Sequence, residues 1–154
     1  NADVVVRITS DCPLIDPGIV DLVIRNYIGN IASFCGSCNV IKRTYPRGLD
    51  TEVYGFETIE RAWKEAKRAD HREHVTKYIY DHPDDFKVVS VENPRDLSAL
   101  RWTVDEKDDF LLVEKIYNRL YKSNGIFYID DVLDVLDKEP QLGMINQKVK
   151  QKAV

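Results

Sequence analysis

The sequence predicts an α/β domain whose sheet includes some antiparallel pairing. Along the 154 residues, short β-branched runs alternate with amphipathic stretches in the order strand, helix, strands, helices, strands, helices. Hydrophobic residues make up 44% of the chain and charged residues 31%, which is ordinary for a globular protein and argues against disorder. The length is sufficient for one domain with a hydrophobic core.

The first elements are set by one apolar run and one helix start. Residues 4–8 read Val-Val-Val-Arg-Ile, which is typical of a buried strand in a parallel sheet. Asp16 and Pro17 then supply an N-cap and a first helical position. Apolar residues continue one face of this helix to about Ile28, and residues 31–34 fit a short strand.

The later elements follow from changes in hydrophobic period. Residues 45–50 form a turn-rich polar loop, and residues 51–56 alternate as a half-buried strand does. Further strands are predicted at 86–91 and 100–104, and helices at 58–67, 70–80, 107–122 and 129–138. Asn124 and Gly125 break the longest of these helices.

Composition restricts the class of protein. The net charge of −4 argues against a nucleic-acid binder, which would show a basic face. No apolar run approaches the ~20 residues of a membrane span, and the N-terminus lacks the pattern of a signal peptide. The three cysteines, an odd number, favour a reducing compartment. We therefore expect a cytoplasmic protein with free thiols.

Cys35 and Cys38 form a C-x-x-C spacing. One functional interpretation is a redox pair, and another is half of a zinc site, which would need two further ligands at suitable spacing. Because the motif lacks its usual context, a chance spacing near the end of a strand is favoured.

Two carboxylates follow predicted strands and are candidates for chemistry. Asp11 comes after residues 4–8, and Asp105 comes after residues 100–104. Ligands of α/β proteins bind outside the carboxyl ends of strands, and two converging carboxylates can hold Mg²⁺. The alternative is that each aspartate caps a loop or helix, and spacing alone favours that alternative.

Two charged segments are weaker candidates. Arg47 in the polar loop could hold a carboxylate or phosphate, and Asp50 and Glu52 could accept hydrogen bonds from sugar hydroxyls. Glu73 and His74 lie in a His-Arg-Glu-His run whose spacing does not match a zinc-protease motif. Without further context, a solvated loop and an exposed helix face are favoured for these two segments.

Four collinear segments carry a family resemblance. They read RITSDCPLID at 7–16, RTYPRGLDTEV at 43–53, REHVTKYIY at 72–80 and LRWTVD at 100–105. Together they resemble the sugar cytidylyltransferases of the acylneuraminate and spore coat polysaccharide biosynthesis protein F type. The match extends from residue 2 to about residue 150.

The resemblance implies a Rossmann-like nucleotidyltransferase fold with a mixed, mostly parallel sheet flanked by helices. It also implies an enzyme that activates a nonulosonate-like sugar with CTP, giving CMP-sugar and pyrophosphate for surface polysaccharide synthesis. Mg²⁺ would neutralise the phosphate charge and orient the attack. A homodimer or other homo-oligomer in the cytoplasm is expected, with no nucleic-acid or membrane partner.

The resemblance assigns roles to named residues of this chain. Asp11 and Arg7 are expected to be catalytic, and Asp11 and Asp105 match the family's metal-binding aspartates. The segments expected near the sugar contain Arg47, Asp50, Glu52, Glu73, His74 and Arg101. Whether Arg7 and Arg101 position phosphate or brace the aspartate loops stays open.

The family's front segment, a Gly-rich phosphate-binding loop, is not among these residues. We therefore expect residues 1–142 to be the C-terminal portion of a cytidylyltransferase-like domain and residues 143–154 to be a loosely held basic tail. On this expectation the chain alone is inactive or nearly so. The alternatives are a non-enzymatic oligomerising domain and a related nucleotidyltransferase or glycosyltransferase acting on nucleotide sugars.

Overall fold

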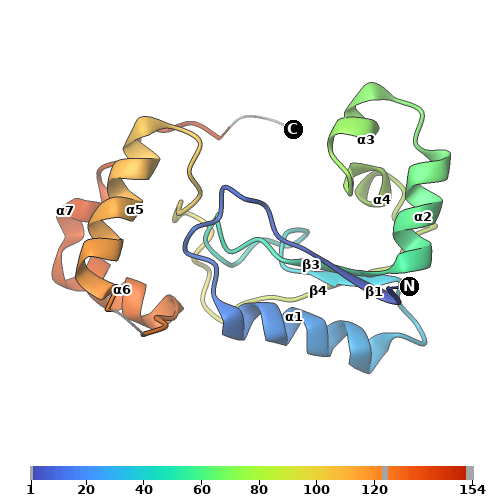
Figure 1. Ribbon diagram of the computed structural model, residues 1–154, viewed down its shortest axis with the longest axis horizontal. Coiled ribbons are helices and arrows are strands. Elements are labelled where there is room, and N and C mark those ends of the chain that lie inside the picture. The colour runs from blue at the N-terminus through green and yellow to red at the C-terminus, as the bar shows by residue number, and fades with distance from the viewer. Residues whose placement is uncertain (1, 123–124, 152–154) are drawn as a thin grey trace.

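The computed structural model describes residues 2–122 and 125–151, in which helices flank a four-stranded sheet (Figure 1). The strands are β1 (Val4–Arg7), β2 (Gly36–Cys38), β3 (Glu52–Gly55) and β4 (Val88–Ser90), in the order β1-β3-β2-β4. β3 is antiparallel to both β1 and β2, whereas β2 and β4 are parallel. The α/β class is confirmed, but less of the described sheet is parallel than predicted.

Helix α1 (Pro17–Asn30) covers one face of the sheet (Figure 1). It begins where the sequence predicts, because the Asp16 carboxylate accepts hydrogen bonds from the backbone N–H groups of Gly18 (2.7 Å) and Ile19 (3.1 Å). The second Asp16 oxygen accepts the N–H of Ile129 at 2.7 Å. One buried aspartate therefore caps α1 and ties it to the helices at the C-terminal end of the chain.

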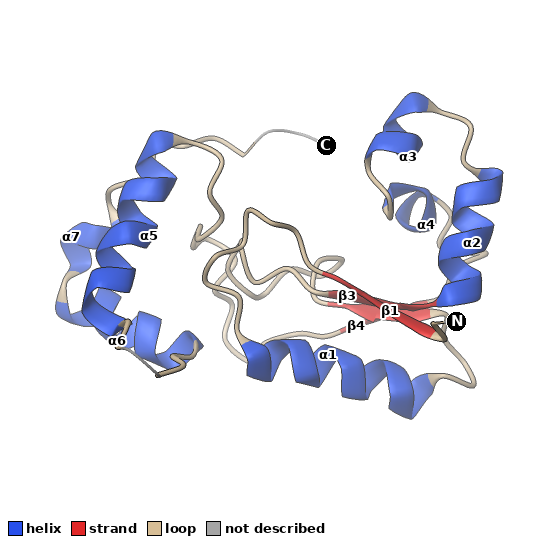
Figure 2. Cartoon of the chain, in the orientation of Figure 1, coloured by secondary structure: helices blue, strands red, loops and turns tan. Residues whose placement is uncertain are grey.

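The other helices form two groups on either side of the sheet region (Figure 2). One group contains α2 (Phe56–Glu65), α3 (Ala69–Glu73) and α4 (Lys77–Asp81). The other contains α5 (Lys107–Leu120), α6 (Ile129–Lys138) and the short α7 (Pro140–Gly143), which the sequence did not predict. Asn124, predicted to break α5, lies outside the described residues.

The prediction of a single helix over residues 70–80 is wrong. The chain leaves helical geometry at His74, whose φ and ψ are −99° and 87°, and α4 starts anew at Lys77. Between the two helices, Thr76 turns its hydroxyl toward Glu52. A long-range polar contact thus replaces continuous helical periodicity.

Two hydrophobic cores lie on opposite faces of the sheet. Val53 belongs to one and Tyr54 to the other, as expected for consecutive residues of a strand. The larger core joins α1 to the C-terminal helices and contains Ile19, Val23, Leu112, Ile116, Val132 and Leu142. The smaller core, beneath α2 and α4, contains Tyr54, Ala62, Ile79 and Phe86.

Two predicted strands differ from the structure. Residues 4–8 were expected to be a buried parallel strand, but β1 pairs on one side only, and Val6 and Ile8 are 40% and 42% exposed. Residues 100–104 form no strand. They are extended and contribute an isolated bridge between Arg101 and Arg47.

The prediction of a strand at residues 31–34 is also wrong. Residues 31–33 form a turn, and β2 starts later, at Gly36. Gly36 is required there, since a Cβ would lie 2.2 Å from the Tyr54 ring and 2.7 Å from the Val53 carbonyl oxygen. The close approach of β2 and β3 therefore fixes which residues form the strand.

The expected loose tail is packed in its first part. Asn146 is buried and donates from its side-chain amide to the Arg101 carbonyl and to Asp109. Residues 152–154 lie outside the described residues. Within residues 2–122 and 125–151, no helix combines the length and apolar character that crossing a bilayer requires.

Candidate functional site

A cavity of about 910 Å³ gathers most of the residues that the sequence singled out. Glu52 contributes to it from β3, on the sheet face opposite Val53 and α1, so the cavity opens away from the larger core. Its polar lining comes from β1 and β3, from the loops after β1 and β2, from the α3–α4 turn and from α4, with Lys87 and Gln151 in addition. The predicted site residues among them are Arg7, Asp11, Arg47, Asp50, Glu52 and His74.

We call one side of this cavity the glutamate end, defined by Arg7, Glu52, Thr76 and Tyr80. Glu52 is 3% exposed, and one of its oxygens accepts hydrogen bonds from the hydroxyls of Thr76 (2.9 Å) and Tyr80. Its other oxygen forms an ion pair with Arg7. Three side chains, those of Arg7, Thr76 and Tyr80, therefore already hold the Glu52 carboxylate. Of these, Arg7 is one-third exposed and lines the cavity.

Tyr54 and Tyr80, which lie behind Glu52, act as hydrogen-bond donors through their hydroxyl groups. The Tyr54 hydroxyl donates to the Tyr80 hydroxyl at 2.9 Å, and Tyr80 donates to Glu52. Burial raises the pKa of both tyrosines, and the negative charge of Glu52 raises them further. The hydroxyls stay protonated at neutral pH and hold the carboxylate in place.

Two arginines, one in the polar loop and one just before it, differ in their partners. Arg43 and Asp50 form a two-pronged ion pair at 2.6 and 2.8 Å. In the described chain no carboxylate lies within ion-pair distance of the Arg47 guanidinium, which lines the cavity. Burial and the nearby charges of Arg43 and Arg101 lower the pKa of Arg47, although a guanidinium stays charged at neutral pH. Arg47 is therefore a cation suited to an anionic ligand.

Gly48 fixes the loop that presents Arg47. Its φ of +101° lies in the left-handed region, and a Cβ would come within 2.5 Å of backbone atoms of Trp102 and Thr103. Arg47 donates its N–H to Leu100 O at 3.0 Å and accepts from Trp102 N at 2.7 Å. Two of the motifs found in the sequence are therefore joined directly through their backbones.

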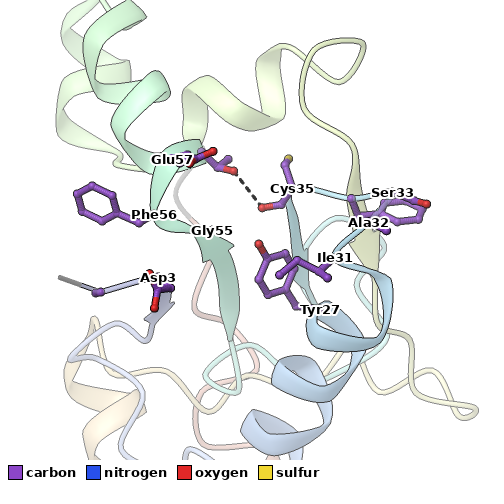
Figure 3. Close-up of a pocket in the computed structure, with 12 residues that line it drawn as sticks. Asp3, Tyr27, Ile31, Ala32, Ser33, Cys35, Gly55, Phe56 and Glu57 are labelled. Carbon is purple, nitrogen blue, oxygen red and sulfur yellow. Dashed lines mark hydrogen bonds between the residues drawn. The ribbon is translucent and has the colours of Figure 1, made fainter.

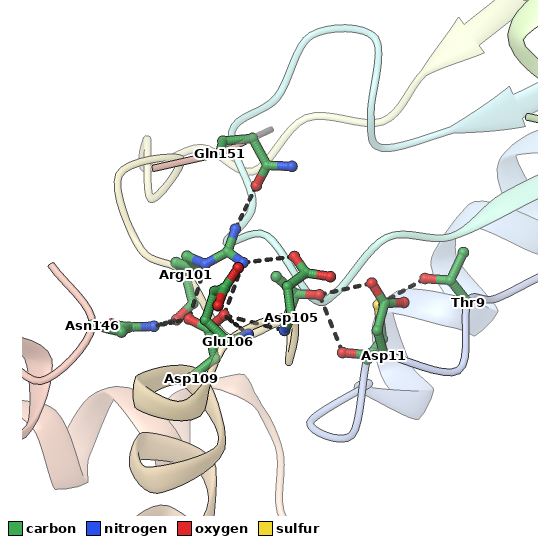
Figure 4. A network of polar contacts seen from close by, with 10 residues as sticks. Thr9, Asp11, Arg101, Asp105, Glu106, Asp109, Asn146 and Gln151 are labelled. Carbon is green, nitrogen blue, oxygen red and sulfur yellow. Dashed lines mark hydrogen bonds and ion pairs between the residues drawn. The ribbon is translucent and has the colours of Figure 1, made fainter. Parts of the chain in front are cut away.

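A second polar cluster adjoins the cavity through Asp11, which lines it; we call this cluster the aspartate end, defined by Asp11, Arg101, Thr103, Asp105 and Asp109 (Figure 4). The Asp11 carbonyl accepts the N–H of Val104 at 2.9 Å, and its carboxylate accepts the Thr103 hydroxyl at 2.9 Å. Asp105 follows Val104 directly, so the two segments that carry Asp11 and Asp105 lie side by side. Burial alone would raise the pKa of Asp11, but hydrogen bonds from Thr9 and Thr103 outweigh it and lower the pKa.

Arg101 joins the aspartate end to the C-terminal helices. Its guanidinium donates to Asp105 at 2.6 Å and to both oxygens of Asp109 at 2.9 and 2.8 Å. Sequence reasoning missed Asp109 and Asn146. The Glu106-x-x-Asp109 spacing is a capping-box signal that could have drawn attention to Asp109, whereas Asn146 carries no local signal.

The donors at the aspartate end fit a divalent cation of the magnesium type. Asp11 is ionised and partly exposed, and the Asp105 side chain is 37% exposed. Carboxylate oxygens are ligands that Mg²⁺ prefers, and each carboxylate has more lone pairs than its present hydrogen bonds use. Asp11 and Asp105 are therefore the residues that could hold the ion.

The α3–α4 segment places its polar residues unevenly. His74 lines the cavity, whereas Glu73 is exposed on α3 and does not. His71, expected on an exposed helix face, is buried and its ring contacts Asp81 at 2.8 Å. Together with Asp70 these two could offer ligand atoms to a metal, but Arg68 and Lys77 already pair with the two carboxylates.

A second cavity, of about 970 Å³, lies at the opposite end of β1 and β3 (Figure 3). Its lining includes the thiol-bearing Cys35, whose carbonyl accepts the Thr58 hydroxyl at 3.1 Å. Its ionisable side chains include the carboxylates of Asp3 and Glu57, and its described lining contains no lysine or arginine. This cavity is therefore poorly suited to an anionic ligand. Cys35 and Cys38 are free thiols, and burial raises the pKa of each.

Comparisons with known proteins point to one family. A sequence model described as cytidylyltransferase matches residues 1–154. An uncharacterized protein of Methanocaldococcus jannaschii is 38% identical over 99% of this chain and 61% of its own length. The spore coat polysaccharide biosynthesis protein SpsF of Bacillus subtilis is 29% identical over 89% of this chain and 56% of its own length.

A solved structure gives the same result for the fold. A cytidylyltransferase from Leptospira borgpetersenii superposes with a TM-score of 0.85 and 28% identity, covering 98% of this chain and 61% of that one. The chain thus spans about three fifths of the length of the relatives it matches.

Proposed function

This chain belongs to the cytidylyltransferase family, and on that premise we propose that its 910 Å³ cavity binds a sugar acid, nonulosonate-like in kind, for cytidylyl transfer from CTP. The observation that carries the proposal is Arg47, a cation that lines the cavity without a carboxylate partner in the described chain. An arginine fork is the geometry that recognises a carboxylate.

In the proposed reaction, the anomeric oxygen of the sugar forms a bond to the α-phosphorus of CTP. The bond from that phosphorus to the bridging oxygen breaks, pyrophosphate leaves, and the proton of the anomeric hydroxyl passes to solvent. Arg47 would hold the sugar carboxylate, and Arg7, oriented by Glu52, would place a donor toward the phosphate or the sugar. His74 and Asp50 line the same cavity and would contact the sugar.

We propose Asp11 and Asp105 as the residues that hold Mg²⁺. When bound, the ion would neutralise phosphate charge and favour in-line displacement. The lowered pKa of Asp11 makes it a weak base, so its role fits an oxygen ligand better than a proton acceptor. The spore coat relative suggests that the product serves surface polysaccharide synthesis.

Calorimetric binding tests the sugar site. N-acetylneuraminate serves as the acidic probe and its methyl ester as the neutral control. We expect Arg47→Gln to weaken binding of the acid roughly 10- to 100-fold and to leave binding of the ester unchanged, because a charge-assisted contact is lost. Arg25→Gln is the matched control, because this substitution removes the same charge from α1, away from the cavity. Equal binding of acid and ester would contradict the proposal.

A nucleotide screen separates the alternatives. Thermal shift with CTP, UTP and GTP, each with Mg²⁺, should favour CTP, with little or no pyrophosphate release by this chain alone. A preference for UTP or GTP would indicate a different nucleotidyltransferase or a glycosyltransferase. No response to any nucleotide or sugar would favour a non-enzymatic domain.

We also propose that the protein self-associates through the outer side of α2. Trp63 is 62% exposed and, with Phe56 and Val75, lines a groove of about 600 Å³. Clustered exposed apolar side chains commonly mark a protein interface. Sedimentation should show a dimer that Trp63→Glu converts to a monomer, and a monomeric parent protein would refute the proposal.

A further inference from the structure

We propose that Asp109 is a positioning residue, which fixes Arg101 and through it the carboxylate of Asp105. The inference rests on the proposed function, in which Asp105 binds a cation. It replaces a role in sugar binding for Arg101, whose side chain is only 10% exposed and does not line the cavity.

The hydrogen bonds of Asp109 show that it does more than cap a helix. It is fully buried, and one oxygen accepts the backbone N–H groups of Asp105 (3.1 Å) and Glu106 (3.0 Å) at the start of α5. That oxygen supplies the cap. The other oxygen accepts Arg101 Nε at 2.9 Å and Asn146 Nδ2 at 2.8 Å, which no helix cap requires.

The geometry of Arg101 transmits this fixation to Asp105. Its Nε and Nη2 form a fork on the two oxygens of Asp109, and such a fork fixes the plane of the guanidinium. In that plane Nη2 also reaches Asp105 Oδ2 at 2.6 Å. Asn146 supports the same unit, because its amide donates to both the Arg101 carbonyl and Asp109 (Figure 4).

Asp109 therefore holds Asp105 twice, once through the backbone N–H and once through Arg101. Residues that orient a metal ligand support its affinity for the ion, and their loss typically costs about 10- to 100-fold in metal affinity. An asparagine at position 109 has a single acceptor oxygen, so it cannot serve both the cap and the fork.

The test compares Asp109→Asn with Asp108→Asn in the 154-residue chain. Asp108 is the exposed neighbour on α5, so its change removes the same charge without touching Arg101. Nitrogen-edited NMR reports the exchange rate of the Arg101 Nε–H, and electron paramagnetic resonance reports binding of Mn²⁺ as the probe ion. We expect Asp109→Asn to speed the exchange at least about tenfold and to weaken Mn²⁺ binding about 10- to 100-fold, with Asp108→Asn unchanged.

The outcomes separate this inference from the proposed function. An unchanged Arg101 signal in Asp109→Asn, or equal effects of the two variants, would overturn the positioning role. If the parent chain binds no Mn²⁺, the proposed metal site is wrong, and the Arg101 signal alone decides the positioning role.

A second variant applies if Asp109→Asn does not fold. Arg101→Lys keeps the positive charge but removes the fork. We expect it to fold, as judged by circular dichroism, and to weaken Mn²⁺ binding by about tenfold or more. Parent-like Mn²⁺ binding by Arg101→Lys would show that charge alone suffices and would overturn the proposal.

Discussion

The glutamate end and the aspartate end use their carboxylates differently. At the glutamate end, Glu52 is 3% exposed and three side chains hold its oxygens. At the aspartate end, Asp105 is 37% exposed and keeps lone pairs for a ligand. A buried carboxylate must be paired, whereas a partly exposed one can exchange its partners. The difference separates carboxylates that maintain the fold from those placed to bind.

The sharpest test of this comparison is a matched pair of amide substitutions. Glu52→Gln should lower the free energy of unfolding by about 3 kcal/mol, because it leaves Arg7 without its buried counter-charge; this is the lower end for a broken pair, since Arg7 is one-third exposed. Asp11→Asn should lower it by about 1 kcal/mol, the net value of a typical hydrogen bond, because the asparagine oxygen can still accept one of the partly buried bonds. Urea unfolding measures both, and equal losses would remove the distinction.

Lowering the pH should test whether Asp109 is one of the carboxylates that maintain the fold, because protonation would remove its contribution to stability. Burial raises its pKa, but hydrogen bonds from Arg101 and Asn146 outweigh burial and lower the pKa from 3.8 to about 2. Because the folded pKa is depressed, the stabilisation is complete above 3.8 and is lost as the pH falls through about 2. It amounts to about 2 kcal/mol at neutral pH.

The measurement is the difference in unfolding free energy between the parent protein and Asp109→Asn as a function of pH. The difference should shrink as the pH falls from 3.8 toward 2. A carboxyl that titrates in the folded protein at an ordinary aspartate pKa, as seen by NMR, would contradict the interpretation of Asp109 as a paired buried charge.

A smaller effect is expected from Tyr80→Phe at the glutamate end. The change removes one donor to Glu52 and the acceptor of the Tyr54 hydroxyl, which should cost about 1 to 2 kcal/mol. Tyr121→Phe removes a hydroxyl from a side chain that is 65% exposed and should be neutral. Urea unfolding that finds the two variants alike would mean that the tyrosine chain does not support Glu52.

Features encoded by neighbouring residues could be predicted from the sequence. The start of α1 depends on Asp16 and Pro17 alone, and it was predicted correctly. The segments that carry Asp11 and Asp105 were expected to be neighbouring strands, and they are neighbours although residues 100–104 form no strand. An extended stretch tied to Asp11 through Val104 gives the same result.

Features that depend on distant partners could not be predicted. In the break between α3 and α4, Thr76 donates its hydroxyl to Glu52, 24 residues away. Asn146 reaches Asp109 across 37 residues. Hydrophobic periodicity cannot predict either contact, because each joins polar side chains that are distant in the sequence and meet only in the folded chain.

Arg47, whose substitution should weaken ligand binding, is expected to contribute little to the free energy of unfolding. Arg47→Gln should change the free energy of unfolding by no more than about 0.5 kcal/mol, because no carboxylate of the described chain pairs with Arg47 and its backbone bonds to Leu100 and Trp102 do not depend on the side chain. Burial and the charges of Arg43 and Arg101 lower the pKa of Arg47, and removing its charge also relieves the repulsion from those two arginines. Arg43→Gln, which breaks the pair with Asp50, should cost more, by about 1 kcal/mol. Urea unfolding that ranks Arg47 above Arg43 would show that Arg47 supports the fold, and the cavity would then lack its cation for a ligand.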